Sequence, residues 1–264
     1  MLSGYRHNLW RKLDIRRKIV IWMTRKGWLR LGTAAALVIL MGAVFFSHIP
    51  PVATWSHWSL PLAGKVIALD AGHGGPDGGA VSRDGIIEKD LNLAIVLYLR
   101  DYLQQAGAVV VVTREGDHDL ASPDIRGYSR RKTDDLLERV RRIESSRADY
   151  AVSIHMNSMP SPRWSGAQTF YYSGNEGGRH LAENIQHELR TVLENTNRAA
   201  KPNDEVYLLK TLKIPTALVE VGFLSHPEEA RLLADEAYQR KVAAAIYRGI
   251  LSFAAGRPGS ADAR

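Results

Sequence analysis

The feature that most constrains the fold of this chain is an alternation of short apolar, β-branched runs with longer segments of helical spacing. The short runs predict strands at 65–70, 109–113, 150–155, 167–172 and 216–221. Segments with apolar residues at helical spacing predict helices at 88–106, 133–144 and 178–193 and one or two helices within 227–255. This alternation is typical of an α/β fold, so we expect a single domain built on a mostly parallel, twisted sheet with helices on both faces.

Three of these strands end in side chains that can bind a metal. His73 follows the first strand within Asp-Ala-Gly-His-Gly-Gly, His155 ends the third, and Glu220 lies in the last within Val-Glu-Val-Gly-Phe. The carboxyl ends of parallel strands converge on one crevice, where ligands of open α/β sheets bind. Glu88, at the start of the first predicted helix, points toward the same edge. Two imidazoles and a carboxylate there would form a zinc site with an open position for water, and the second glutamate would be a candidate base.

Each of these residues also has a simpler interpretation. The glycines around His73 could cradle a phosphate, although the Lys-Ser/Thr ending of a P-loop is missing. Glu88 could serve only the helix dipole, and His155 could be a buried histidine bonded to a backbone carbonyl. Glu220 has apolar neighbours, where burial raises the pKa of a carboxylate, whereas a nearby zinc ion would lower that pKa. We also consider Asp70 as a group that holds a zinc-binding imidazole in its tautomer.

Other chemistries lack the residues they need. The chain has no cysteine, which excludes disulfides, cysteine-ligated zinc and a thiol nucleophile. Ser158 and Ser225 lack the Gly-x-Ser-x-Gly elbow of a serine hydrolase. The acidic pairs at 134–135 and 228–229 resemble solvated helix starts more than the carboxylates of a glycosidase.

A basic leader and a charge-free run precede the predicted domain. Nine of the 35 Lys and Arg residues lie within residues 1–30 beside one acidic residue, so the rest of the chain carries 26 basic and 27 acidic residues. The net charge of +7 therefore belongs to the leader, which argues against nucleic-acid binding by the domain. Residues 31–46 are uncharged, and together with 47–49 they are long enough to cross a bilayer core of ~30 Å.

The distribution of charge predicts an orientation in the membrane. By the positive-inside rule the leader lies in the cytoplasm and the domain outside it, in the cell envelope. We expect an uncleaved transmembrane anchor; a cleaved signal peptide and a buried core helix are the alternatives. The predicted organisation is a leader at 1–30, an anchor at 31–49, a linker at 50–64, a catalytic domain at 65–256 and a tail at 257–264.

Four segments resemble the zinc-dependent N-acetylmuramoyl-L-alanine amidases of the amidase-3 family. They are 66–80 (Val-Ile-Ala-Leu-Asp-Ala-Gly-His-Gly-Gly-Pro-Asp-Gly-Gly-Ala), 88–93 (Glu-Lys-Asp-Leu-Asn-Leu), 153–158 (Ser-Ile-His-Met-Asn-Ser) and 214–225 (Ile-Pro-Thr-Ala-Leu-Val-Glu-Val-Gly-Phe-Leu-Ser). The likeness runs over about 65–256. Its compact domain and its leader make the chain most similar to the germination-specific, spore-cortex members from Bacillus-type spore formers.

The resemblance implies roles for the four residues and a reaction. His73, Glu88 and His155 are expected to bind Zn²⁺, and Glu220 is expected to be the catalytic residue. The expected reaction is hydrolysis of the amide between N-acetylmuramic acid and L-alanine in peptidoglycan, which removes stem peptides from spore-cortex glycan ahead of muramic-δ-lactam formation. An unidentified regulatory or deacetylase protein is an expected partner.

Four alternative functions stay open. The protein could be a vegetative cell-wall amidase or autolysin, or a zinc peptidase that cuts elsewhere in the stem peptide. It could also be a non-catalytic peptidoglycan-binding module or a membrane-tethered scaffold.

Overall fold

The structure, a computed structural model, describes residues 24–46 and 60–257, and the chain divides into two units that are taken separately. In the first unit, helix α1 (Arg25–Phe46) is long and apolar enough to cross a membrane by length and composition, criteria that a signal sequence also meets. Residues 31–46 of the predicted anchor lie in this helix, and 47–49 fall outside the described residues. The predicted boundaries of leader, anchor and linker therefore remain predictions.

The second unit is an α/β domain built on a sheet with strand order β2-β1-β3-β6-β4-β5. Its strands are β1 (Val66–Ala71), β2 (Val109–Val112), β3 (Tyr150–Asn157), β4 (Gln168–Tyr171), β5 (Lys201–Pro202) and β6 (Thr216–Phe223). The first three strands and β6 run parallel to one another, as the sequence predicts. The runs that form β1, β3 and β6 are rich in valine, isoleucine and leucine and are almost fully buried, which is typical of a sheet covered on both faces, whereas the edge strand β2 is partly exposed.

The expectation of a mostly parallel sheet needs one correction, because the sheet is mixed. Strand β4 runs antiparallel to β6, and β5 follows the direction of β4. The connection between β3 and β4, residues 158–167, contains no helix. A parallel return needs a longer crossover, usually through a helix, so this direct connection sends β4 back in the opposite direction. The helix between β4 and β5 provides such a crossover, and that pair is parallel.

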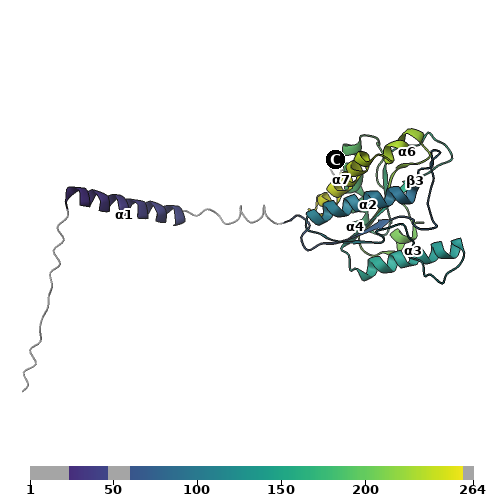
Figure 1. Cartoon of the computed structure of the whole chain (residues 1–264), viewed down its shortest axis with the longest axis horizontal. Coiled ribbons are helices and arrows are strands. Elements are labelled where there is room, and N and C mark those ends of the chain that lie inside the picture. Colours follow the sequence, from purple (N-terminus) through teal and green to yellow (C-terminus); the bar gives the residue numbers. More distant parts are fainter. Residues whose placement is uncertain (1–23, 47–59, 258–264) are drawn as a thin grey trace, which may run out of the picture. The chain divides into compact units, whose positions relative to one another are not determined.

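Helices cover both faces of the sheet, as predicted (Figure 1). Helices α2 (Glu88–Gln105), α4 (Glu176–Leu193) and α7 (Glu236–Ala254) pack on one face around a larger core that includes Ile67, Leu99, Ile185 and Ile246. Helix α3 (Tyr128–Ser145), helix α5 (Tyr207–Thr211) and the residue after α5 contribute Val140, Ile143, Leu208 and Leu212 to a smaller core with Ala68 and Ala151 on the other face. The short α6 (Pro227–Leu233) follows β6. Both cores consist of residues from this unit, so we treat it as an independently folding domain.

The register of the strands places alternate side chains on the face covered by α3. Asp70 pairs with Ser153, which pairs with Leu218, and these three line one cavity on that face. Two residues further along, His155 pairs with Glu220. The pairing therefore brings the ends of the third and last predicted strands into direct contact.

Three elements differ from the sequence expectation. Strand β5 and helix α5 were not predicted, because two and five residues are too few to show a period. Helix α3 begins at Tyr128 rather than at Thr133. Its first turn, Tyr-Ser-Arg-Arg-Lys, has no apolar stripe, and the helix starts after Gly127, whose φ of 86° suits glycine.

Candidate metal centre and catalytic pocket

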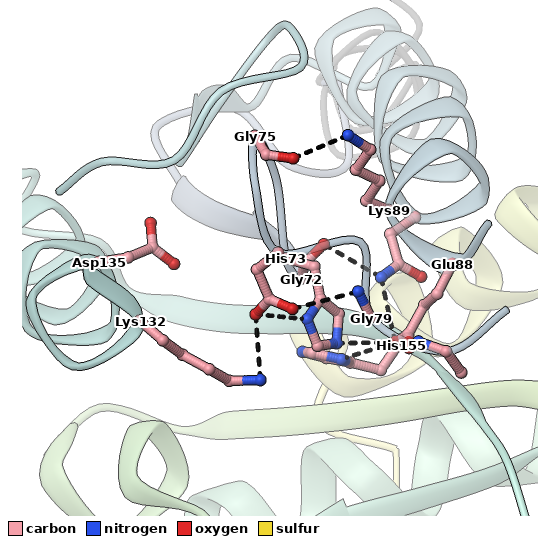
Figure 2. A network of polar contacts seen from close by, with 12 residues as sticks. Gly72, His73, Gly75, Gly79, Glu88, Lys89, Lys132, Asp135 and His155 are labelled. Carbon is pink, nitrogen blue, oxygen red and sulfur yellow. Dashed lines mark hydrogen bonds and ion pairs between the residues drawn. The ribbon is translucent and has the colours of Figure 1, made fainter. Parts of the chain in front are cut away.

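The structure brings His73, Glu88 and His155 together at the carboxyl edge of the sheet, where their possible ligand atoms all lie within 4.8 Å of one another (Figure 2). His73 follows β1, Glu88 is the first residue of α2, and His155 lies near the end of β3. The two imidazole rings meet edge to face, with centroids 5.0 Å apart. Three residues far apart in the sequence thus form one cluster.

Glu88 is the centre of this cluster. Its Oε1 lies 3.2 Å from His73 Nε2 and 3.0 Å from His155 Nδ1. The same oxygen accepts hydrogen bonds from the Met156 amide at 3.0 Å and from Asn92 Nδ2 at 3.3 Å, and Oε2 accepts one from the Ala80 amide at 2.8 Å. Burial alone would raise the pKa of Glu88, but the bonds with the two histidines outweigh it and hold that pKa well below its usual range.

His73 is held by its backbone and by its second ring nitrogen. Its φ of 62° lies in the left-handed region that few residues other than glycine adopt. Its Nδ1 lies 2.9 Å from Asp77 Oδ2, so Nε2 is the nitrogen that faces Glu88. Asp77 is itself held by Tyr128, whose hydroxyl donates at 2.9 Å, and by Lys132 at 3.1 Å, both from α3.

The geometry of the three candidate ligands fits a zinc ion. Ligand atoms at 2.0–2.1 Å from tetrahedral zinc lie about 3.3 Å apart, close to the separations of Glu88 Oε1 from the two imidazole nitrogens. Two imidazoles and one carboxylate form a donor set known from catalytic zinc sites, which leave one position open. The ordered partners of Glu88 and His73 are those expected around ligands that must keep one orientation.

Glu220 lies beside this cluster without belonging to it. It pairs with His155 in the sheet, and its buried Oε2 has no hydrogen-bond partner among the described residues. Burial raises the pKa of Glu220 to about 7, although the two histidines act in the opposite direction. A carboxylate with this pKa can both accept and donate a proton near neutral pH.

A cavity of about 330 Å³ opens beside the four residues. The sheet contributes His155, Leu218 and Glu220, α3 contributes Lys132 and Leu136, and α5 contributes Tyr207 and Leu208. The short helix that the sequence did not reveal therefore forms one wall of the pocket. The volume lies within the range of small-molecule sites.

Asp70 does not hold an imidazole, so that expectation was wrong. Its carboxylate accepts hydrogen bonds from Ser153 Oγ at 2.6 Å, Thr113 Oγ1 at 2.8 Å and Arg139 Nη1 at 2.7 Å. The residue that contacts a ring nitrogen is Asp77, four positions after His73. Asp70 instead neutralises a buried arginine beneath the site.

Arg139, like Asp77, holds the backbone or side chain of a site residue and was not singled out by the sequence analysis. It is 3% exposed and donates to the carbonyl oxygens of Ala71 at 2.7 Å and His73 at 2.5 Å. It also pairs with Asp70 and, at 2.8 Å, with Asp135. The amphipathic pattern of α3 gave no signal for this role, since an arginine in such a helix is usually solvated.

The simpler interpretations can be compared with these contacts. His155 Nδ1 meets the Glu88 carboxylate rather than a backbone carbonyl. Glu88 lies at a helix N-terminus as the dipole interpretation requires, but its carboxylate is buried and is shared by two histidines. The amides of Gly74 and Gly75 bond to Asp77 and Asp117, so they are not free to cradle a phosphate.

The chain is similar to known proteins over the whole of this domain. A family model described as N-acetylmuramoyl-L-alanine amidase matches residues 67–252. The germination-specific N-acetylmuramoyl-L-alanine amidase of Bacillus subtilis is 53% identical over 200 residues, which are 76% of this chain and 84% of that protein. The N-acetylmuramoyl-L-alanine amidase LytC of the same organism is 33% identical over 195 residues, 73% of this chain and 36% of LytC.

A solved structure shares the fold. The CwlD amidase from Clostridioides difficile, solved in complex with the GerS lipoprotein, matches with a TM-score of 0.71 and 42% sequence identity. The match covers 73% of this chain and 99% of that chain. The resemblance predicted from the four sequence motifs is thereby confirmed.

Proposed function

This chain belongs to the N-acetylmuramoyl-L-alanine amidase family, and we propose that it is a zinc enzyme that removes stem peptides from spore-cortex peptidoglycan. The bond cut is the amide between the lactyl group of N-acetylmuramic acid and L-alanine. The observation that carries the proposal is the cluster of His73, Glu88 and His155 beside a buried glutamate with a raised pKa.

The three clustered residues are the proposed zinc ligands. When bound, zinc would polarise the scissile carbonyl and lower the pKa of a water toward ~7. The amides of Met156 and Ala80 donate to the Glu88 carboxylate and orient it. Asp77 bonds to Nδ1 of His73, so that Nε2 is left to face the metal.

Glu220 is the proposed catalytic residue. Its carboxylate takes the proton of the attacking water and then delivers it to the departing amine of alanine. Both transfers need a group with a pKa near the working pH; burial raises the pKa of Glu220, and a bound zinc ion would lower it again. The cavity between α3 and α5 would receive the first residues of the stem peptide.

The spore-cortex role rests on the likeness to the germination-specific enzyme and to CwlD. Cleavage there would leave N-acetylmuramic acid without its peptide, and removal of the acetyl group by a deacetylase would then free the amine that closes the muramic-δ-lactam. A vegetative cell-wall role is the alternative, since LytC also matches this domain. Because the CwlD structure contains a lipoprotein, we also propose that a regulatory or deacetylase protein contacts this chain.

The location is part of the proposal. Helix α1 would anchor the chain in a membrane, with the basic leader in the cytoplasm and the domain outside it. The extracytoplasmic side is where peptidoglycan lies. Labelling of full-length protein in intact cells with a membrane-impermeant reagent would find the domain accessible; protection of the domain would contradict this orientation.

The reaction can be tested by digesting purified peptidoglycan with residues 59–264, with and without a chelator, and analysing the products by mass. We expect stem peptides with free L-alanine amines and peptide-free muramic acid, formed only when zinc is present. Cleavage inside the peptide would identify a peptidase, and binding without cleavage would identify a non-catalytic module. Comparing cortex with vegetative peptidoglycan separates the two amidase roles.

A further inference from the structure

A second groove lies at the same edge of the sheet, outside the catalytic pocket. It has a volume of about 540 Å³ and is lined by Trp164, by Ser165 and by residues 194–198. Its polar lining consists of the charged Glu194 and Arg198 and of four uncharged residues, Ser165, Asn195, Thr196 and Asn197. Amide and hydroxyl groups bond both donors and acceptors, as sugar hydroxyl and acetamido groups require, and an exposed indole offers a flat apolar face.

The indole of Trp164 is held in place although it is exposed. The side chain exposes 39% of its surface. Arg163 Cζ lies 4.7 Å from its ring centroid and Arg198 Cζ lies 5.9 Å from it. Arg198 also stacks on Phe223 at 5.3 Å and donates to the Ser165 carbonyl at 3.1 Å. An aromatic surface fixed in this way loses little conformational entropy when a ligand covers it.

The groove is joined to the catalytic strand by two contacts. Glu229, which is 6% exposed, accepts from the amides of Gly166 at 2.9 Å and Phe223 at 2.8 Å, and so ties the loop after β3 to the end of β6. Gln168, the residue paired with Glu220 across the sheet, contacts Arg198 through its Oε1 at 3.5 Å. A track of side chains thus leads from Glu220 through Gln168 and Arg198 to Trp164.

We propose that this groove binds an N-acetylhexosamine ring of the glycan strand, next to the muramoyl residue whose amide is cut. The inference rests on the proposed function and assigns the two hollows to the two parts of the substrate. The stem peptide enters the cavity between α3 and α5, and the glycan continues over Trp164. The groove therefore makes the enzyme prefer polymeric glycan over a single muramoyl peptide.

Kinetics on two substrates with the same stem peptide test this preference. Covering half of the exposed surface of Trp164 corresponds to a factor of about four to eight in affinity. We expect Trp164→Ala to raise KM for polymeric glycan by about that factor with kcat unchanged, and to leave both constants unchanged on N-acetylmuramoyl-tripeptide. Trp164→Phe keeps an aromatic face and should stay within about twofold of wild type. Leu232→Ala, at an exposed site on α6, is the matched control.

Binding can be measured without turnover or metal. Trp164 is the only tryptophan in residues 59–264, so tryptophan emission from that domain, excited selectively over its tyrosines, reports on this groove. We expect titration with chitotetraose to shift the emission, and Asn197→Ala, which keeps the indole, to weaken the response. Free stem peptide should give no shift.

The outcomes separate this inference from the proposed function. If chitotetraose leaves the tryptophan emission unchanged, or Trp164→Ala keeps the wild-type KM on polymeric glycan, the groove is not a glycan site even though the enzyme is an amidase. If wild type cleaves neither substrate while chitotetraose still shifts the emission, the groove is supported and the proposed reaction fails.

Discussion

Replacing Arg139 by methionine should disrupt the buried hydrogen bonds beneath the metal centre and lower the stability of the whole domain. The guanidinium is buried between Asp70, Asp135 and the carbonyl oxygens of Ala71 and His73. Methionine keeps much of the volume but none of the donors. The substitution would leave buried carboxylates and carbonyls without their partner, which is among the costliest changes a core can suffer.

The size of the effect follows from the buried pair. Removing one partner of a buried ion pair costs about 3–5 kcal/mol, because the other charge stays behind uncompensated. The pKa of Asp70 points in the same direction: burial would raise it, but Arg139, together with His155 and Ser153, lowers it to about 2. Against an unfolded value of 3.8, this shift corresponds to about 2 kcal/mol of stability at neutral pH. For a domain of this size, a loss of 3–5 kcal/mol lowers Tm by about 6–20 °C.

The sign of the pH dependence distinguishes this mechanism from a loss of packing. In wild type the folded pKa of Asp70 is lowered, so its contribution is present above pH 3.8 and is lost as the pH falls through about 2. Without Arg139 the pKa of Asp70 rises, because burial is then opposed only by His155 and Ser153. Asp70 of the variant then becomes protonated at a higher pH than in wild type, so the difference between the two proteins shrinks from pH 7 to pH 4.

Urea unfolding of residues 59–264 at pH 7 and pH 4 measures both effects. The matched control is Arg141→Met, two positions along α3, where the side chain is 64% exposed and pairs with Glu138. That change should alter stability by less than about 0.5 kcal/mol. A loss below about 1 kcal/mol for Arg139→Met at pH 7, or a difference that is the same at both pH values, would refute the reasoning.

Three further predictions concern the site itself. Glu220→Gln should keep zinc content, measured by elemental analysis, but lose about 10²- to 10⁴-fold in turnover; full activity would remove Glu220 from the proton transfers. Asp77→Asn should weaken zinc binding about 10- to 100-fold in competition with a chelator, since His73 loses the partner of its Nδ1; an unchanged affinity would deny Asp77 that role. Gly79→Ala should abolish zinc binding, because its Cβ would lie 2.5 Å from Glu88 Oε2, whereas Gly85→Ala, at a similar positive φ with open space around it, should only lower stability. Equal zinc loss in both alanine variants would show that backbone strain, not the collision, disturbs the site.

The clustering of His73, Glu88, His155 and Glu220 could be predicted from the sequence because each lies at or near the end of a strand or the start of a helix. His155 and Glu220 close two buried strands, and neighbouring parallel strands must meet at their carboxyl ends. Glu88 starts the helix that follows β1, and that helix returns to the same edge. Periodicity and the handed connection of strand to helix decide these positions locally.

The frame around the site could not be predicted because it depends on contacts between distant segments. Arg139 lies 66 residues from His73 in the chain, and nothing in the spacing of α3 indicates which of its arginines turns inward. In the sequence Asp77 is one polar residue of a Gly-rich loop, and only the folded backbone of that loop brings its carboxylate to the His73 ring. The assignment of Asp70 failed for the same reason: its neighbours in sequence suggested the imidazole, and its neighbours in space are Ser153 and Arg139.

The reversed direction of β4, which the sequence pattern did not reveal, has a consequence for the substrate. Had β4 run parallel to β6, its first residue would lie at the far edge of the sheet, away from the metal centre. Because it runs antiparallel, Gln168 begins the strand directly beside Glu220, and the loop that leads into it carries Trp164 at the catalytic edge. The connection without a helix between β3 and β4 thus does more than mix the sheet. It places the second groove at the same edge of the sheet as Glu220, where the proposed glycan site and the catalytic pocket can contact one substrate.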